Sequence, residues 1–86
     1  MEVVLLTQEH CAFCDDAKRM LDRLTADYDF TVREVDLGSP EGEALARDAG
    51  VLFPPGIVVD SDPVSYGRPS ERRVRREFDR RTVAQR

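Results

Sequence analysis

The segment that most restricts the fold is Cys11-Ala12-Phe13-Cys14, which holds the only two cysteines of this 86-residue chain. An apolar run, Val3-Val4-Leu5-Leu6-Thr7, precedes it, and apolar side chains at helical spacing follow it. This order predicts a strand over about residues 2 to 7, a short turn, and a helix from about Cys11 to Ala26. The first cysteine then lies at the start of the helix, and the second lies one turn inside it.

That placement has chemical consequences for both sulfur atoms. Residues three apart share one face of a helix, so Cys11 and Cys14 can close a small disulfide ring or remain as two thiols. The unbonded N–H groups and the dipole at a helix N-terminus favour the thiolate of Cys11, which is the form that attacks disulfides. The carboxylates of Asp15 and Asp16 in the first turns oppose the thiolate and a protonated His10 would favour it, so the sequence leaves the net direction open. The spacing therefore predicts a reversible thiol–disulfide site.

Two other interpretations of the cysteines remain open. A structural zinc site normally takes four nitrogen or sulfur ligands, but the chain offers only Cys11, Cys14 and the single His10. We therefore expect no metal in a monomer. Free cysteines also pack well in a core, and this interpretation suits Cys14 better than it suits the pair.

Length and composition limit the broad class of protein. A chain of 86 residues forms one domain, which we place over residues 1–86. No stretch approaches the roughly 20 apolar residues of a membrane span, and the N-terminus lacks the basic start of a signal peptide. We expect a cytoplasmic monomer without membrane contact. In that reducing compartment, a cysteine pair is more plausibly catalytic than a permanent cross-link.

Charge is unevenly distributed along the chain. The net charge is −4, with −9 over residues 1 to 62 and +5 over residues 63 to 86. Such polarity can steer partners, although a solvated basic helix face explains the second part more simply. The overall acidity argues against nucleic acid as a partner.

The middle of the chain predicts a second strand and a second helix. Phe30 to Asp36 forms the strand, with Val32 and Val35 among its apolar residues. Gly38-Ser39-Pro40 supplies a break, an N-cap hydroxyl and a proline for the first helical position. The helix runs to about Asp48, buries Leu45 and Ala49, and is ended by Gly50.

The last third predicts a hairpin and a final helix. Val51-Leu52-Phe53-Pro54-Pro55-Gly56 leads into a strand at Ile57-Val58-Val59, because prolines can lie only at the start of such a strand. Asp60 to Pro63 forms the turn to a short strand at residues 64 to 66. Ser70 caps a helix over residues 71 to 81 that buries Val74 and Phe78, and residues 82–86 are expected to fray.

The order strand–helix–strand–helix–strand–strand–helix resembles the thioredoxin-like fold, and within it the glutaredoxins. The resemblance covers about residues 2 to 81. It depends on the CxxC segment after the first strand, on the proline before the third, and on the glycine-led entry to the final helix. It implies an α/β fold in which a mixed four-stranded sheet is flanked by helices in the order βαβαββα.

The resemblance also implies roles for individual residues. Cys11 matches the nucleophile of the family, and Cys14 matches the buried resolving cysteine. Phe13 stands where the family has tyrosine, so it either lines the substrate groove or packs in the core. Pro55 matches the family's cis proline, which predicts a cis Pro54–Pro55 peptide bond beside the cysteines.

Departures from the family pattern concern the small-thiol substrate. Pro54 has no N–H to donate to a bound thiol, and Gln8 replaces a lysine that would pair with a glutathione carboxylate. The family's double glycine and aspartate near the last helix are absent, and Arg68 is a candidate to bind a carboxylate instead. His10, Phe13, Pro54, Pro55 and Arg68 are therefore the candidate substrate-binding residues. The chain has twelve arginines and one lysine, which is typical of a GC-rich genome. Mycothiol is therefore a candidate co-substrate in addition to glutathione.

We therefore predict a thiol–disulfide oxidoreductase without a bound cofactor, in which Cys11 attacks the disulfide of a protein or small thiol. A reductase or a small thiol would supply the electrons. A copper(I) carrier is one alternative, because small copper chaperones also place CxxC between a strand and a helix. An iron–sulfur cluster shared by a dimer and a non-catalytic thioredoxin-like binding domain are the others.

Overall fold

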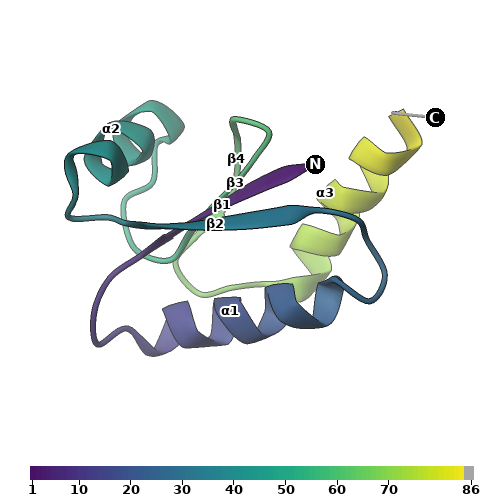
Figure 1. Ribbon diagram of the computed structural model, residues 1–86, viewed down its shortest axis with the longest axis horizontal. Helices are drawn as coiled ribbons and strands as arrows, with labels where there is room; N and C mark the ends of the chain where they lie inside the picture. The colour runs from purple at the N-terminus through teal and green to yellow at the C-terminus, as the bar shows by residue number, and fades with distance from the viewer. Residues whose placement is uncertain (85–86) are drawn as a thin grey trace.

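The computed structural model describes residues 1–84, and their strands and helices follow the predicted order βαβαββα. The elements are β1 (Glu2–Thr7), α1 (Ala12–Leu24), β2 (Thr31–Asp36), α2 (Pro40–Ala49), β3 (Gly56–Val59), β4 (Asp62–Tyr66) and α3 (Glu71–Ala84). The strands form one sheet in the order β2-β1-β3-β4. Helices α1 and α3 cover one face of this sheet, and α2 covers the other (Figure 1).

Strand β1 is the centre of the sheet and fixes where the cysteines lie. It pairs in parallel with β2 and antiparallel with β3, and β3 pairs antiparallel with β4. Gly56 lies opposite both Leu6 and Tyr66. The C-terminal end of β1, the start of β3 and the end of β4 therefore meet at one end of the sheet.

Alternate side chains of β1 enter two separate cores, because successive residues of a strand point to opposite faces. On the face covered by α1 and α3, Val3 and Leu5 contact a cluster that includes Leu21, Val74 and Phe78. On the face covered by α2, Val4 and Leu6 contact Val35, Ala46, Val51 and Val58. Burial on both faces explains why β1 reads as a continuous apolar run.

The ends of α1 and β2 differ slightly from the predicted ones. Helix α1 starts at Ala12, with Cys11 as its N-cap residue, and it ends at Leu24 rather than at Ala26. The hydroxyl of Thr25 donates to the carbonyl of Asp22 at 2.6 Å, which satisfies one carbonyl of the last turn. Strand β2 starts at Thr31, because Phe30 packs against the core between α1 and α3 instead of continuing the strand.

The hairpin and the last helix are both longer than predicted. The turn consists of Asp60 and Ser61 alone, whose φ angles of 47° and 71° suit a two-residue hairpin loop. Strand β4 therefore already starts at Asp62 and includes Pro63, which an edge strand tolerates. Helix α3 continues to Ala84, three residues beyond the predicted end at Arg81, so the helix includes part of the segment 82–86 that was expected to fray. Residues 85 and 86 lie outside the described part.

Helix α2 faces the sheet with a different side from the predicted one. Its buried residues are Gly42 and Ala46, whereas Leu45 and Ala49 are only partly buried at the edge of the core. A Cβ atom built on Gly42 would lie 1.9 Å from the carbonyl oxygen of Asp36. The helix can therefore approach the end of β2 this closely only because residue 42 has no side chain.

We expect Gly42→Ala to lower the free energy of unfolding by about 1–3 kcal/mol, because α2 must move away from the backbone of Asp36. Urea unfolding followed by circular dichroism measures this loss. Asp48→Ala, on an exposed position of the same helix, is the matched control and should change stability by no more than about 0.5 kcal/mol. Equal stability of the Gly42→Ala variant and the unchanged protein would contradict the close approach.

Ion pairs join the ends of α1 and α3. Arg75 of α3 pairs with Asp27 at 2.9 Å, just beyond α1, and Arg23 of α1 pairs with Glu71 at 2.9 Å. Hydrogen bonds from Arg23 and then Arg75 lower the pKa of the Glu71 carboxyl. These pairs hold α3 in register along α1. No helix within residues 1–84 is both long enough and apolar enough to span a bilayer.

Candidate active site

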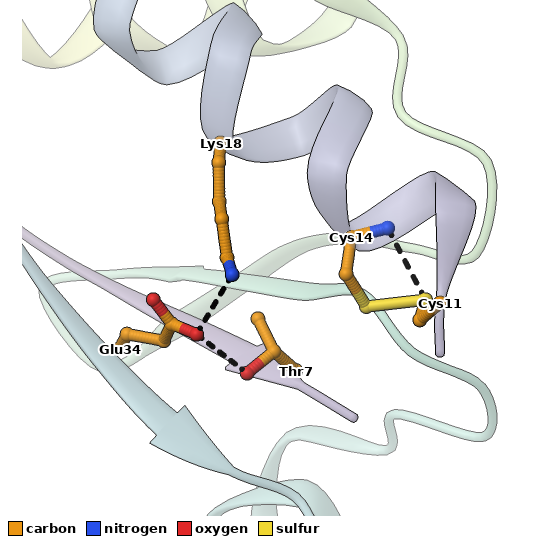
Figure 2. Close-up of a disulfide and its surroundings, with 5 residues drawn as sticks. All are labelled: Thr7, Cys11, Cys14, Lys18 and Glu34. Atoms are coloured by element: carbon orange, nitrogen blue, oxygen red, sulfur yellow. Dashed lines mark hydrogen bonds and ion pairs between the residues drawn. A yellow bond between two sulfur atoms is a disulfide. The ribbon is translucent and has the colours of Figure 1, made fainter. Parts of the chain in front are cut away.

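Cys11 and Cys14 form a disulfide at the start of α1, with their Cα atoms 5.2 Å apart (Figure 2). The backbone N–H of Cys14 donates to the sulfur of Cys11 at 3.1 Å, so Cys11 is the N-cap residue of the helix. Cys11 is partly exposed, whereas Cys14 is only 2% exposed. One sulfur is therefore open to attack a partner, and the other is enclosed beneath it.

The local sequence places the disulfide at the end of the sheet. Strand β1 ends at Thr7, and the exposed residues Gln8, Glu9 and His10 connect it to the helix. His10 has a φ of 56°, which turns the chain into the extended conformation of Cys11. The N–H of Asp15 then donates to the carbonyl of Cys11 at 3.2 Å, which starts the helical hydrogen bonding.

Three polar side chains lie beside the disulfide on the side of Cys14 (Figure 2). The hydroxyl of Thr7 donates to Glu34 Oε1 at 3.1 Å, and the ammonium group of Lys18 lies 3.1 Å from the same oxygen. The sequence alone did not indicate this arrangement. One signal was present, because Lys18 follows Cys14 by four residues and so shares its face of α1.

The loop before β3 lies at the same end of the sheet as the disulfide. The Pro54–Pro55 peptide bond is cis, as predicted. Pro55 is buried, and its carbonyl accepts a hydrogen bond of 3.0 Å from the N–H of Gly67. The predicted glycine-led entry to α3 is thus bonded directly to the proline loop. Pro54 is partly buried and has no N–H to offer.

The other candidate substrate-binding residues are less close to one another. Phe13 is 45% exposed and belongs to neither core, so its ring is free to contact a partner. His10 is also exposed. Arg68 lines a small groove with Asp16, on the opposite flank of α1 from Cys14. The structure thus gathers the cysteines and the prolines at one end of the sheet, while Arg68 points elsewhere.

An exposed apolar surface adjoins this end of the sheet. Leu52 and Phe53 are 69% and 62% exposed, and the Phe53 ring lies 6.0 Å from that of Tyr66, which is 44% exposed. Phe53 and Tyr66 also line a groove of about 600 Å³. Exposed apolar groups of this size commonly mark contact sites for other molecules.

Metal binding was the main alternative use of the cysteines. Within residues 1–84, no three side chains of the types His, Cys, Asp and Glu gather closely enough to hold an ion. The last described element is the helix α3, whereas the copper chaperones named above end in a strand.

The strand order, the helices on both faces and the cysteine pair at the start of α1 define a thioredoxin-like α/β protein. A sequence model described as Glutaredoxin matches residues 3–64, which is most of the chain. The chain therefore belongs to the glutaredoxin family. Among curated proteins, the comparison found no match.

Solved structures agree on the fold. The alignment with a malarial protein covers 92% of this chain and 93% of that protein, with 20% sequence identity and a TM-score of 0.65. The alignment with thioredoxin 1 from Thermosipho africanus covers 95% of this chain and 99% of that protein, with 11% sequence identity and a TM-score of 0.63. The alignment with reduced Escherichia coli glutaredoxin covers 96% of this chain and 99% of that protein, with 21% sequence identity and a TM-score of 0.61. At these identities the likeness establishes the fold alone.

Family, fold and the Cys11–Cys14 pair together support a thiol–disulfide redox function. Thiols or disulfides are therefore the expected partners. The two cysteines also differ in exposure, since Cys11 is partly exposed and Cys14 is buried, and this difference bears on their roles.

Proposed function

We propose that this protein is a thiol–disulfide oxidoreductase in which Cys11 is the nucleophile and Cys14 is the resolving cysteine. The observation that carries the proposal is the position of Cys11. Its sulfur is partly exposed and accepts the N–H of Cys14 at the N-cap of α1. A thiolate at this position is stabilised by that hydrogen bond and by the helix dipole.

The reaction starts from the reduced pair. The Cys11 thiolate attacks one sulfur of a substrate disulfide, a mixed disulfide forms, and the first substrate thiolate leaves and takes up a proton. Cys14 then loses its proton and attacks the sulfur of Cys11, which releases the second substrate thiol and leaves the Cys11–Cys14 disulfide. The substrate gains two electrons and two protons: both electrons come from the cysteine pair, one proton comes from Cys14, and the other comes from water because Cys11 reacts as the thiolate. A reductase or a small thiol restores the dithiol.

Burial of Cys14 supports its role as the second cysteine. Cys14 as a residue is only 2% exposed, so a bulky disulfide does not reach it, but its sulfur lies beside that of Cys11 and can attack there. The apolar surface of Leu52, Phe53 and Tyr66 supports contact with protein substrates. Pro54 offers a carbonyl but no N–H, which leaves a bound small thiol with one backbone hydrogen bond fewer.

The electron source is tested by offering glutathione, mycothiol with its reductase, and thioredoxin with its reductase as alternatives in one disulfide-reduction assay. We expect at least one of them to sustain turnover well above the rate without protein. Turnover with none of the three would argue for a non-catalytic binding domain.

The role of Cys14 is tested in the same assay with Cys14→Ser. This variant should still form a mixed disulfide at Cys11, seen as a mass increase of one substrate thiol, but should lose reduction of protein disulfides. Full reduction of protein disulfides by Cys14→Ser would show that a second small thiol, rather than Cys14, releases the product.

A further inference from the structure

We propose that the charges around the cysteine pair select disulfides that carry positive charge over disulfides that carry carboxylates. This inference rests on the proposed function, because it concerns the substrate class of the same two sulfurs. The site is the cysteine pair itself, and the surrounding side chains decide which disulfides approach it fastest.

On the side of Cys14, carboxylates outnumber cations. A groove of about 330 Å³ includes the three polar residues drawn beside the disulfide in Figure 2, and it is lined by Thr7, Gln8, Glu9, Lys18, Glu34 and Asp36. Lys18 is the only cationic side chain among them, and its ammonium group already pairs with Glu34 (Figure 2). Among the described residues 1–84, the carboxylates of Glu9 and Asp36 form no ion pair, so the side chains that line the groove carry net negative charge.

On the side of Cys11, the nearest charges are also negative. Asp15 follows Cys11 by four residues, so it neighbours Cys11 on the surface of α1. Glu9 precedes Cys11 by two residues in the connecting loop. Both side chains are exposed, and neither forms an ion pair within residues 1–84. Both charged side chains within four residues of Cys11 that form no ion pair among residues 1–84 are thus carboxylates.

No arginine among residues 1–84 lines the acidic groove beside Lys18. Arg68 lines the groove with Asp16 on the opposite flank of α1. Arg19 pairs with Asp16 at 2.6 Å. Pro54 has no N–H to offer a carboxylate. An anionic disulfide such as that of glutathione thus approaches against the local field, whereas a disulfide flanked by ammonium or guanidinium groups approaches with it.

The test uses the fully reduced protein and three small symmetrical disulfides. These are cystamine, which is cationic, 2-hydroxyethyl disulfide, which is uncharged, and 3,3′-dithiodipropionate, which is anionic. Loss of protein thiols, trapped by acid and alkylation, gives each second-order rate constant at neutral pH. Each constant is divided by that of dithiothreitol with the same disulfide, because leaving-group reactivity differs among the three.

At low ionic strength we expect the normalised rate constant to be at least about tenfold higher for cystamine than for 3,3′-dithiodipropionate, with the uncharged disulfide between them. In about 0.5 M NaCl the ratio should fall to within about threefold, because the screening length shrinks to a few ångströms. Equal or reversed rate constants at low salt would overturn the inference.

A charge variant tests which residues are responsible. Glu9→Gln combined with Asp15→Asn should reduce the cystamine-to-dithiodipropionate ratio at low salt by about threefold or more. The ratio cancels any change in the reactivity of Cys11 itself, because that change affects both disulfides alike. Asp22→Asn combined with Asp29→Asn removes the same two charges from the last turns of α1 and the loop that follows it, and should leave the ratio unchanged. An unchanged ratio in the double variant would also overturn the inference.

The uncharged disulfide separates the two proposals. If the reduced protein reacts with 2-hydroxyethyl disulfide but shows no charge order, the inference on substrate charge fails and the proposed function stands. If no disulfide reacts faster with the protein than with a Cys11→Ser variant, the proposed function itself fails.

Discussion

Cys11→Ser should lower the rate of disulfide reduction by at least about 10³-fold, because a hydroxyl at the helix start is not ionised and cannot form a mixed disulfide. Cys14 cannot take over, since its sulfur is 2% exposed beneath Cys11. The measurement is reduction of 2-hydroxyethyl disulfide by whichever electron source supports the unchanged protein. Unfolding curves of the variant, compared with those of the reduced unchanged protein, verify that the fold is retained.

Ala12→Ser is the matched control for this experiment. It introduces the same hydroxyl one residue further along, at an exposed position that holds neither sulfur, and should leave the reduction rate within about twofold. Substantial activity in Cys11→Ser would mean that Cys14 attacks substrates directly. The difference in exposure between the two cysteines would then not decide which of them is the nucleophile.

Phe78→Ala should lower the free energy of unfolding by about 3–5 kcal/mol, the usual cost of removing a buried aromatic ring. Phe78 is fully buried, and its ring lies 5.2 Å from that of Tyr28 and 5.0 Å from that of Phe30. It thus joins α3 to the segment between α1 and β2. For a domain of this size, the loss corresponds to a fall in Tm of about 12–40 °C, which calorimetry measures.

Leu52→Ala controls for the loss of apolar volume in general. Leu52 is 69% exposed, so its truncation should change stability by no more than about 0.5 kcal/mol. Both variants are compared in the oxidised form, with the Cys11–Cys14 disulfide closed. A loss at Phe78 no larger than that at Leu52 would contradict its central place in the core.

The order of elements and the position of the cysteines could be predicted because both depend on local patterns. Four aliphatic residues before CxxC indicate a buried central strand, and the helical spacing after it indicates α1. The cis proline followed from the likeness of Pro55 to a family position, and the structure has it cis. Element ends were less predictable, because hydroxyl caps and a two-residue turn decide them.

Contacts between distant segments could not be predicted in the same way. Thr7, Lys18 and Glu34 come from three different elements, and only the parallel pairing of β1 with β2 brings them together. Gly42 is the residue that lets α2 touch the backbone of Asp36, a contact that its place in the sequence does not reveal. Both features depend on how elements pack, which hydrophobic periodicity does not specify.

Helix α3 lies beyond the segment that the family model matches, yet it completes one of the two cores. Val74 and Phe78 become available only after every other described element has been synthesised. On the ribosome, the helix that carries Cys11 and Cys14 therefore emerges early but keeps an uncovered apolar side until α3 arrives.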